Sequence, residues 1–395
     1  MCGWVADRTS SRRGPLLVGL GALGGATLLL CFGRGVGVLV VGRVLQGFSA
    51  AVVWTVGLAL LVDTVGWGWV GECMGYVALA MSLAVLVAPV LGGVVFARAG
   101  WFAVFGMAGG LVGVDVVMRC LLVEKGVARR WEGVAGTGGE GGEKEGEEAV
   151  AEEIAIVPSN GRSVKGRNSF VLLLSSRRLL AALYCTLAQS ILLTAWDAVL
   201  PLYVNRIWGW SSIGAGLIFF PLILPSFLSP LFGYWSDKKG PRIPTALGFL
   251  LAIPFLVLLR FVNHDNLRQK VLLCALLACL GFALSMAMTP LLAEITYVVG
   301  DKEQSHPGAF GGKGAYATAY GLFNMAFAGG MLVGPIWGGF VTQSKGWGTM
   351  CWSLAILSIS GAIVAELWVG GWVGKSGKEA REKKVEVSNS GRGEV

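Results

Sequence analysis

Gly3-Trp4-Val5-Ala6-Asp7-Arg8, followed by Arg12 and Arg13, forms a short polar turn beside an apolar run. The pattern returns at Gly233-Tyr234-Trp235-Ser236-Asp237-Lys238, which is followed by Arg242. Both copies start with a glycine, hold an aspartate in the same place and then carry positive charge. Because one pattern recurs with one spacing, the chain is predicted to contain an internal duplication.

A second pair of motifs keeps the same order along the chain. Ala88-Pro89-Val90-Leu91-Gly92-Gly93 lies in the first half, and Gly334-Pro335-Ile336-Trp337-Gly338-Gly339 lies in the second. Two ordered motif pairs strengthen the case for a duplication. Duplicated apolar halves are the usual build of a secondary transporter.

The composition predicts a membrane protein. Of the 395 residues, 54% are hydrophobic and only 14% are charged, with a mean hydropathy of +0.67. A soluble protein is closer to a quarter charged. Apolar runs of about 20 residues, long enough to cross a bilayer, occur at 15–33, 36–61, 74–97, 101–122, 179–204, 211–232, 243–261, 271–298, 315–341 and 348–372. We therefore expect an all-α membrane protein with about ten transmembrane helices, four in the first half and six in the second.

The duplication also makes a prediction about the start of the chain. The second copy of the turn follows two apolar segments, whereas only two residues precede Gly3. If the halves are equivalent, two transmembrane helices of the ancestral plan are missing. The alternative to a working carrier is then a truncated chain or an incomplete gene model. Such a product would not transport and would serve at most as a binding or regulatory membrane protein.

Four segments follow from the composition. The range 1–123 is expected to form an N-terminal bundle of four helices, and 179–373 a C-terminal bundle of six. Between them, 124–178 contains many glutamates and glycines, so we expect a disordered cytoplasmic linker. The charged range 374–395 is expected to be a disordered cytoplasmic tail.

The positive charge is predicted to be distributed unevenly across the membrane. With the first turn in the cytoplasm and about ten spans, both termini are cytoplasmic, and most of the 32 lysines and arginines fall on that side. Topology then explains the formal net charge of +8, so we expect no nucleic-acid partner. The 8 cysteines are scattered and the 2 histidines lie in predicted loops. We therefore expect no metal site, no cofactor and no enzyme activity.

The repeated turn resembles the major facilitator superfamily. The pattern G-x-x-A-D-R-x-x-x-R-R-G, its echo GYWSDKKGPR and a mid-span arginine in the next-but-one helix stand in that family's order. Finer features resemble fungal drug:proton antiporters and relatives of the vesicular amine transporters. The resemblance implies a fold of two pseudo-symmetric helical bundles with a cavity between them at the membrane midplane.

The resemblance gives the turn residues the role of a conformational latch, a contact made in one transport state and released in the other. A carboxylate there can meet a helix N-terminus and a basic side chain. The alternative is that these charges only fix the topology. The latch candidates are Gly3, Asp7, Arg8, Arg12, Arg13, Gly233, Asp237, Lys238 and Arg242.

A charged residue within a predicted span is the next candidate. Arg43, with Gln46 and Gly47, resembles the family's fourth-helix signature R-x-x-x-G. A charge inside a membrane is costly and therefore indicates function, and in proton-coupled relatives this arginine is linked to proton transfer. The alternative is an arginine whose long side chain reaches the outer interface.

The second motif pair predicts helix bends. The fifth-helix motif of antiporters is GPxxGG, which the first copy resembles with Ala88 in place of the first glycine. Proline removes a backbone hydrogen bond, and paired glycines allow close contact. The alternative is a kink needed only for packing. The residues of this helix-bend motif are Pro89, Gly92, Gly93, Gly334 and Pro335.

Two acids within predicted spans are candidates for coupling or substrate binding. Asp197 lies deep in a span, close to Pro201. Glu294 follows Pro290 near the end of another span, where the alternative is an acid that faces water. A carboxylate in a span can load and release a proton and can attract a cation. Asp115, by contrast, is expected to form a structural ion pair with Arg119.

The range 319–329, which leads into the second bend motif, resembles the eleventh helix of the fungal relatives of vesicular amine transporters. Asn324 stands where the amine transporters have an acid, and asparagine does not titrate. Tyr316, Tyr320 and Phe323 share one helix face. They either pack against other helices or line a cavity for a cationic or aromatic substrate.

These observations together predict a carrier of small organic molecules, cationic or amphiphilic, that exports its substrate by alternating access coupled to protons. The expected partners are the substrate, protons and the lipid bilayer, and the protein is expected to be a monomer. Its membrane would be the plasma membrane or a vacuolar or vesicular membrane.

Overall fold

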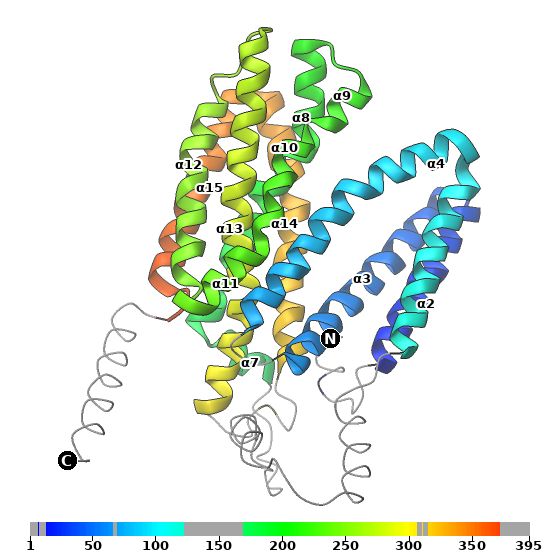
Figure 1. Cartoon of the computed structure of the whole chain (residues 1–395), viewed down its shortest axis with the longest axis vertical. Coiled ribbons are helices and arrows are strands. Elements are labelled where there is room, and N and C mark those ends of the chain that lie inside the picture. The colour runs from blue at the N-terminus through cyan, green and yellow to red at the C-terminus, as the bar shows by residue number, and fades with distance from the viewer. Residues whose placement is uncertain are drawn as a thin grey trace, which may run out of the picture. The chain divides into compact units, whose positions relative to one another are not determined.

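The computed structural model describes residue 7 and residues 13–65, 69–121, 169–305, 310 and 315–371. Every regular element in these ranges is a helix (Figure 1), so the predicted all-α class is confirmed. The helices are, in chain order, α2 (Arg13–Phe32), α3 (Val36–Thr64), α4 (Val70–Leu121), α7 (Ser169–Leu174), α8 (Arg177–Trp208), α9 (Ser212–Leu217), α10 (Phe219–Ile223), the 3-10 helix η3 (Leu224–Leu228), α11 (Ser229–Lys239), α12 (Arg242–Leu259), α13 (Leu267–Ser305), α14 (Tyr316–Lys345) and α15 (Trp347–Trp368).

The described part of the chain contains 9 helical stretches long and apolar enough to cross a membrane. One of them, α4, has 52 residues and joins two helices at Gly100, whose φ is 77°. The predicted spans 74–97 and 101–122 lie on either side of this glycine. A left-handed backbone is readily adopted only by glycine, so Gly100 marks the turn between two spans. Because α4 counts as two spans, the 9 stretches of the described residues correspond to the expected number of about ten spans.

The predicted span 211–232 is broken into short helices. It contains α9, α10, η3 and the start of α11. Pro221, Pro225 and Pro230 lie along it, and each proline lacks the N–H that a continuous helix needs. Just before this segment α8 ends at Trp208 and is capped by Gly209, which has φ 62° and donates its N–H to Asn205 O (2.9 Å).

The chain forms two compact units, and each takes segments from both sequence halves. Unit 1 comprises Met1–Thr64, Val95–Val171 and Val299–Gly321. Unit 2 comprises Val65–Val94, Leu172–Val298 and Leu322–Val395. A part of α4 therefore belongs to unit 2, whereas the beginning of α14 belongs to unit 1.

Small residues set the helix packing within unit 1. The α2 residue Gly19 lies so close to α3 that a Cβ there would be 3.1 Å from Val52 and Val53 side-chain atoms. Ser49 Oγ donates to Gly19 O at 2.6 Å across the same contact. Further along the chain, Arg119 Nε lies 3.2 Å from Asp115 Oδ1, so the predicted ion pair is confirmed.

Unit 2 contains a longer stripe of glycines. Gly330, Gly334 and Gly338 of α14 face α8, where Cβ atoms would lie 2.5 Å from Ser190 Cβ, 2.3 Å from Thr194 Oγ1 and 2.6 Å from Ala195 O, respectively. Ser190 Oγ also donates to Phe327 O at 2.8 Å. Glycines one helical turn apart thus let the α8 and α14 backbones approach closely, as in many membrane helix pairs.

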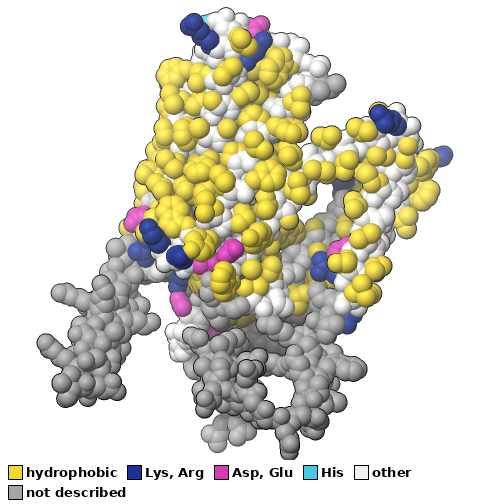
Figure 2. Space-filling model, in the orientation of Figure 1, with side chains coloured by type: hydrophobic (Ala, Val, Ile, Leu, Met, Phe, Trp, Pro, Cys, Tyr) yellow, Lys and Arg dark blue, Asp and Glu magenta, His cyan; other side chains and the backbone are white. Residues whose placement is uncertain are grey.

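Large apolar side chains remain exposed along the helices, for example Leu202, Leu250 and Phe340. In the face drawn in Figure 2, hydrophobic side chains cover the length of the unit 2 helices, and charged side chains gather at the ends. Lipid covers such a surface in a membrane protein. The apolar helices make this chain an integral, multi-pass membrane protein.

Several sequence predictions concern residues outside the described ranges. These are the latch candidates Gly3, Arg8 and Arg12, most of the predicted linker 124–178 and the tail 374–395. The last part of that linker range is described and contains α7 and the first two residues of α8. That two helices of the ancestral plan are absent stays a prediction from the duplicated motifs.

Candidate functional site

The aspartate of the second turn caps the N-terminus of α4. The backbone N–H of Gly71 donates to Asp237 Oδ1 at 2.7 Å, and the N–H of Glu72 donates to Oδ2 at 2.9 Å. A third donor, the Tyr297 hydroxyl of α13, reaches Oδ1 at 2.5 Å. The first N–H groups of a helix lack partners within the helix and carry a partial positive charge. A carboxylate that accepts two of them neutralises both deficits.

Glycines make this cap possible. A Cβ on Gly71 would lie 2.5 Å from Asp237 Oδ1, and a Cβ on Gly233 would lie 2.0 Å from Gly71 O. One turn further along α4, a Cβ on Gly75 would lie 2.5 Å from Pro230 Cα. The α4 and α11 backbones therefore touch at these glycines. The glycine that begins the second turn motif is needed for close approach.

The aspartate of the first turn does the same to α14. Asp7 Oδ1 accepts the backbone N–H of Ala317 at 3.1 Å, and Oδ2 accepts the N–H of Thr318 at 2.9 Å. The Thr318 hydroxyl adds a third hydrogen bond to Oδ2 at 2.7 Å. These residues lie within unit 1, just as the Asp237 cap lies within unit 2.

The two caps share the same backbone hydrogen bonds. Each aspartate uses one oxygen for the second N–H of a helix and the other oxygen for the third, and each also accepts a hydroxyl hydrogen bond. Each also joins the sequence halves. Asp7 of the first half caps a helix of the second half, and Asp237 of the second half caps a helix of the first. We call these contacts the Asp7 cap and the Asp237 cap.

Arginines of the two turns bind the opposite kind of helix end. Arg13 Nη2 donates to the carbonyl of Cys120, at the end of α4. Arg242 Nε donates to Val369 O at 2.9 Å, and its Nη2 donates to Gly371 O, just after α15. Helix C-termini carry unpaired carbonyls and a partial negative charge. Each turn thus supplies an acid to one helix start and a base to one helix end.

The remaining latch candidate of the second turn lies apart from the cap. Lys238 is exposed, and its Nζ lies 4.5 Å from the centroid of the Tyr234 ring, one turn back on α11. This is a cation–π contact along one helix.

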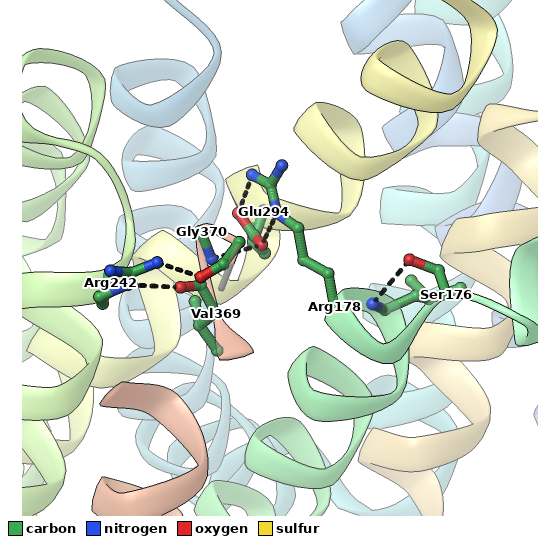
Figure 3. A network of polar contacts seen from close by, with 8 residues as sticks. Ser176, Arg178, Arg242, Glu294, Val369 and Gly370 are labelled. Atoms are coloured by element: carbon green, nitrogen blue, oxygen red, sulfur yellow. Dashed lines mark hydrogen bonds and ion pairs between the residues drawn. The ribbon is translucent and has the colours of Figure 1, made fainter. Parts of the chain in front are cut away.

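Glu294 lies at the centre of a buried polar network that joins four helices (Figure 3). Its side chain is 0% exposed, and Arg178 Nη2 of α8 donates to Oε2 at 2.8 Å while Nε pairs with Oε1. The Gly370 N–H, just beyond α15, donates to Oε1 at 2.8 Å. Arg242 of α12 binds the residues on either side of that glycine. Full burial does not fit the alternative of a water-facing acid.

The other acid, Asp197, lies elsewhere on α8. Its side chain is exposed, and it precedes Pro201 by one helical turn. Arg43 of α3 is also exposed, and its Nη1 donates to Gln46 Oε1 at 3.0 Å. Arg43 lines an open, largely apolar depression together with Val36, Leu39, Val40 and Val44.

The aromatic face of α14 is buried. Tyr316, Tyr320 and Phe323 are 9%, 0% and 4% exposed, respectively, whereas Asn324 is half-buried. Burial of all three rings is what helix packing requires.

The two helix-bend motifs have different surroundings. In the first, Pro89 lies within α4, and a Cβ added to Gly92 or Gly93 would meet no atom within 4 Å. In the second, Gly334 precedes Pro335 within α14 and packs against α8.

Several residues of these contacts are not among the sequence candidates, including Gly71, Ala317, Tyr297 and Arg178. Gly71 and Ala317 contribute backbone N–H groups, which carry no residue-type signal. The predicted linker 124–178 includes Arg178, which belongs to α8. Ser176, whose Oγ accepts the Leu179 N–H at 3.4 Å, marks the true start of α8 and could have shown that Arg178 is helical.

Metal ligands do not gather in the described ranges: there, no three His, Cys, Asp or Glu residues form a group that could hold an ion. The arrangement consists of charged hydrogen bonds at helix ends.

Comparison with known proteins agrees with the architecture. Residues 1–312 match the profile of the Major Facilitator Superfamily. An uncharacterised MFS-type transporter of Schizosaccharomyces pombe, C18.02, is 31% identical over 379 residues, which cover 92% of this chain and 81% of that protein. The MFS-type transporter ppzB of Metarhizium rileyi is 32% identical over 403 residues, which cover 93% and 82% of the two chains.

A solved structure has a similar fold. The human organic anion transporter MFSD10 (TETRAN) superposes with a TM-score of 0.64 over 92% of this chain and 79% of that one, at 19% sequence identity. At this identity the similarity concerns the fold alone.

Proposed function

The chain belongs to the Major Facilitator Superfamily, and from this premise we propose that it exports small organic molecules across a membrane by alternating access coupled to protons. In such carriers two helical bundles rock around a central site, so that the site opens first to one side and then to the other. The substrate is an amphiphilic or cationic molecule, the protein acts as a monomer, and both termini face the cytoplasm. Its membrane is the plasma membrane or a vacuolar or vesicular membrane.

The pair of aspartate caps is the observation that carries this proposal. Each cap joins a turn of one sequence half to a helix start of the other half. Rocking of the halves would pull the helix N-terminus away from the carboxylate and leave both groups to water. The caps therefore suit latches that hold one transport state and open in the next. Arg13 and Arg242 anchor the same two turns by hydrogen bonds to carbonyl groups at helix C-termini.

Asp197 is the coupling residue in this proposal. Its side chain is exposed within α8, one helical turn before Pro201. A carboxylate at membrane depth can take up a proton or pair with a cationic substrate, and competition between the two would couple their movements. Arg43 and Gln46 of α3 are the second candidates. The Glu294 carboxylate is already bound by Arg178 and by the Gly370 N–H, so we assign it a structural role.

The test uses the full-length protein, purified and reconstituted in liposomes that carry a pH gradient. Ethidium and rhodamine 6G serve as amphiphilic cationic probes, and carboxyfluorescein serves as an anionic comparison. We expect gradient-driven movement of a cationic probe that a protonophore abolishes and that Asp197→Asn abolishes as well.

Probe movement that does not depend on the proton gradient would refute proton coupling and would indicate a uniporter. Failure of every probe to move, with a folded protein, would reject export of such molecules and favour a binding or regulatory membrane protein.

A further inference from the structure

The two aspartate caps differ in the origin of their hydroxyl donor. At the Asp7 cap the hydroxyl belongs to Thr318, a residue of the capped helix itself. At the Asp237 cap it belongs to Tyr297, a residue of α13, which is not the capped helix. When the cap opens, a donor on the capped helix moves away from the aspartate together with that helix. A donor on a third helix remains next to the aspartate if the third helix does not move.

About four turns before Tyr297, helix α13 packs tightly against α10 and α11. The rings of Phe232 on α11 and Phe282 on α13 meet edge to face, with centroids 5.2 Å apart. A Cβ on Gly281 of α13 would lie 1.9 Å from Leu222 O of α10, so these backbones are in contact. All of these residues belong to the second sequence half and to unit 2.

The Glu294 network holds α13 close to Tyr297. Glu294 lies three residues before Tyr297, and its carboxylate is bound by Arg178 of α8 and by the Gly370 N–H. Buried charge-assisted hydrogen bonds of this kind hold a helix in one position. The Tyr297 hydroxyl is therefore presented to Asp237 from a rigid support.

We propose that Tyr297 is a positioning residue that holds the Asp237 carboxylate in its capping orientation whether or not α4 is bound. The Asp237 cap is thus preorganised for closing. A side chain that is already oriented loses less conformational freedom when its partner returns. The inference rests on the proposed latch role of Asp237, and it adds a kinetic difference between the two caps that no sequence feature indicates.

Preorganisation makes a specific kinetic prediction. If the Tyr297–Asp237 hydrogen bond exists in both the open and the closed state, its loss slows closing and leaves the rate of opening unchanged. If the bond exists only in the closed state, its loss instead speeds opening. The two cases differ in a measurable rate.

Cys73 provides the reporter. It follows Glu72 in the first turn of α4, and its side chain is half-buried. In a full-length chain whose other cysteines are replaced by alanine, alkylation of Cys73 by N-ethylmaleimide reports opening of the cap. At low reagent concentration the alkylation rate follows the open fraction, whereas at saturating reagent it equals the opening rate.

The variant is Tyr297→Phe, which removes only the hydroxyl group. We expect the alkylation rate at low reagent to rise about fivefold, the scale of the conformational freedom that one side chain loses when it is ordered, with the plateau at saturating reagent unchanged. In an Asp237→Asn background the same substitution should have a smaller effect, because the amide oxygen is a weaker acceptor than the carboxylate. Tyr184→Phe is the matched control, since Tyr184 bonds Ser360 away from the cap at 2.7 Å.

A raised plateau, an unchanged rate at both concentrations, or additive effects of Tyr297→Phe and Asp237→Asn would overturn the inference. Alkylation requires no transported substrate, so the two proposals fail separately. If no probe is transported but Cys73 is alkylated as expected, only the export function is rejected. Active transport with unaffected alkylation rejects the role of Tyr297 alone.

Discussion

Gly233 and Gly71 lie so close that a methyl group on Gly233 would be 2.0 Å from the carbonyl oxygen of Gly71. The contact is between two backbones, so no side chain can move aside to relieve a clash. The first glycine of the repeated turn thus has a steric reason to be glycine in its second copy. It lets the helix that carries Asp237 reach the start of α4.

Gly233→Ala is expected to prevent the Asp237 cap from closing. The added methyl group would separate α11 from α4 and lengthen both hydrogen bonds to the carboxylate. Cys73 should then be alkylated at nearly the reagent-limited rate, and probe transport should fall severalfold. Gly92→Ala is the matched control because a Cβ there meets no atom within 4 Å. Normal alkylation kinetics in Gly233→Ala would show that the contact is not tight.

Asp7→Asn and Asp237→Asn are each expected to destabilise the state in which their cap is closed. The amide keeps the shape of the side chain but loses the charge that interacts with the helix N-terminus. A cap of this kind contributes about 0.5–2 kcal/mol, so each variant should lower the melting temperature by a few degrees. Thermal unfolding in detergent measures this, with Asp265→Asn, which removes an exposed pair with Lys270, as control. Equal melting of all three variants would contradict the caps.

Removing one partner of the Glu294–Arg178 pair is expected to be among the most damaging single changes in unit 2. Glu294 is fully buried, and an unpaired buried charge costs about 3–5 kcal/mol. Arg178→Met should therefore destabilise strongly. Arg178→Met combined with Glu294→Gln should be less harmful than the sum of the single changes, because no charge is then left unpaired. Midpoints of denaturant unfolding test this non-additivity. Simple additivity would mean that the ion pair makes no energetic contribution.

Gly334→Val is expected to push α14 away from α8. A Cβ at Gly334 would lie 2.3 Å from Thr194 Oγ1 and 3.0 Å from Ile191 O. Overpacking of a tight contact costs about 1–3 kcal/mol. Gly339→Val changes the same helix at a position with open space and should be tolerated. The thermal stability of the two variants gives the comparison, and equal stability would argue against a packed α8–α14 contact.

The helical class and most spans were predictable because a membrane span is a local property of the sequence. About 20 apolar residues in a row suffice, and nothing distant needs to be known. The break of 211–232 into short helices had a local signal as well, in Pro221, Pro225 and Pro230. The exact start of α8 was less evident, because Arg177 and Arg178 read as the end of a polar linker.

The candidate site was only half visible for a physical reason. Asp7 and Asp237 are distinctive residues in a repeated turn, so one side of each cap could be named. The other side consists of backbone N–H groups, which every residue except proline has. Tyr297 also gave no signal, since a tyrosine near the end of a span is typical of the membrane interface. Only the arrangement in space assigns it to Asp237.

The exchange of segments between the two compact units has a consequence for a divided chain. Unit 1 contains Val299–Gly321 from the second half, and unit 2 contains Val65–Val94 from the first. Two polypeptides made by cleavage between the halves would each lack a piece that the other holds. We expect such fragments to recover a native fold only when they are produced together, as a split protein whose complementation is obligatory.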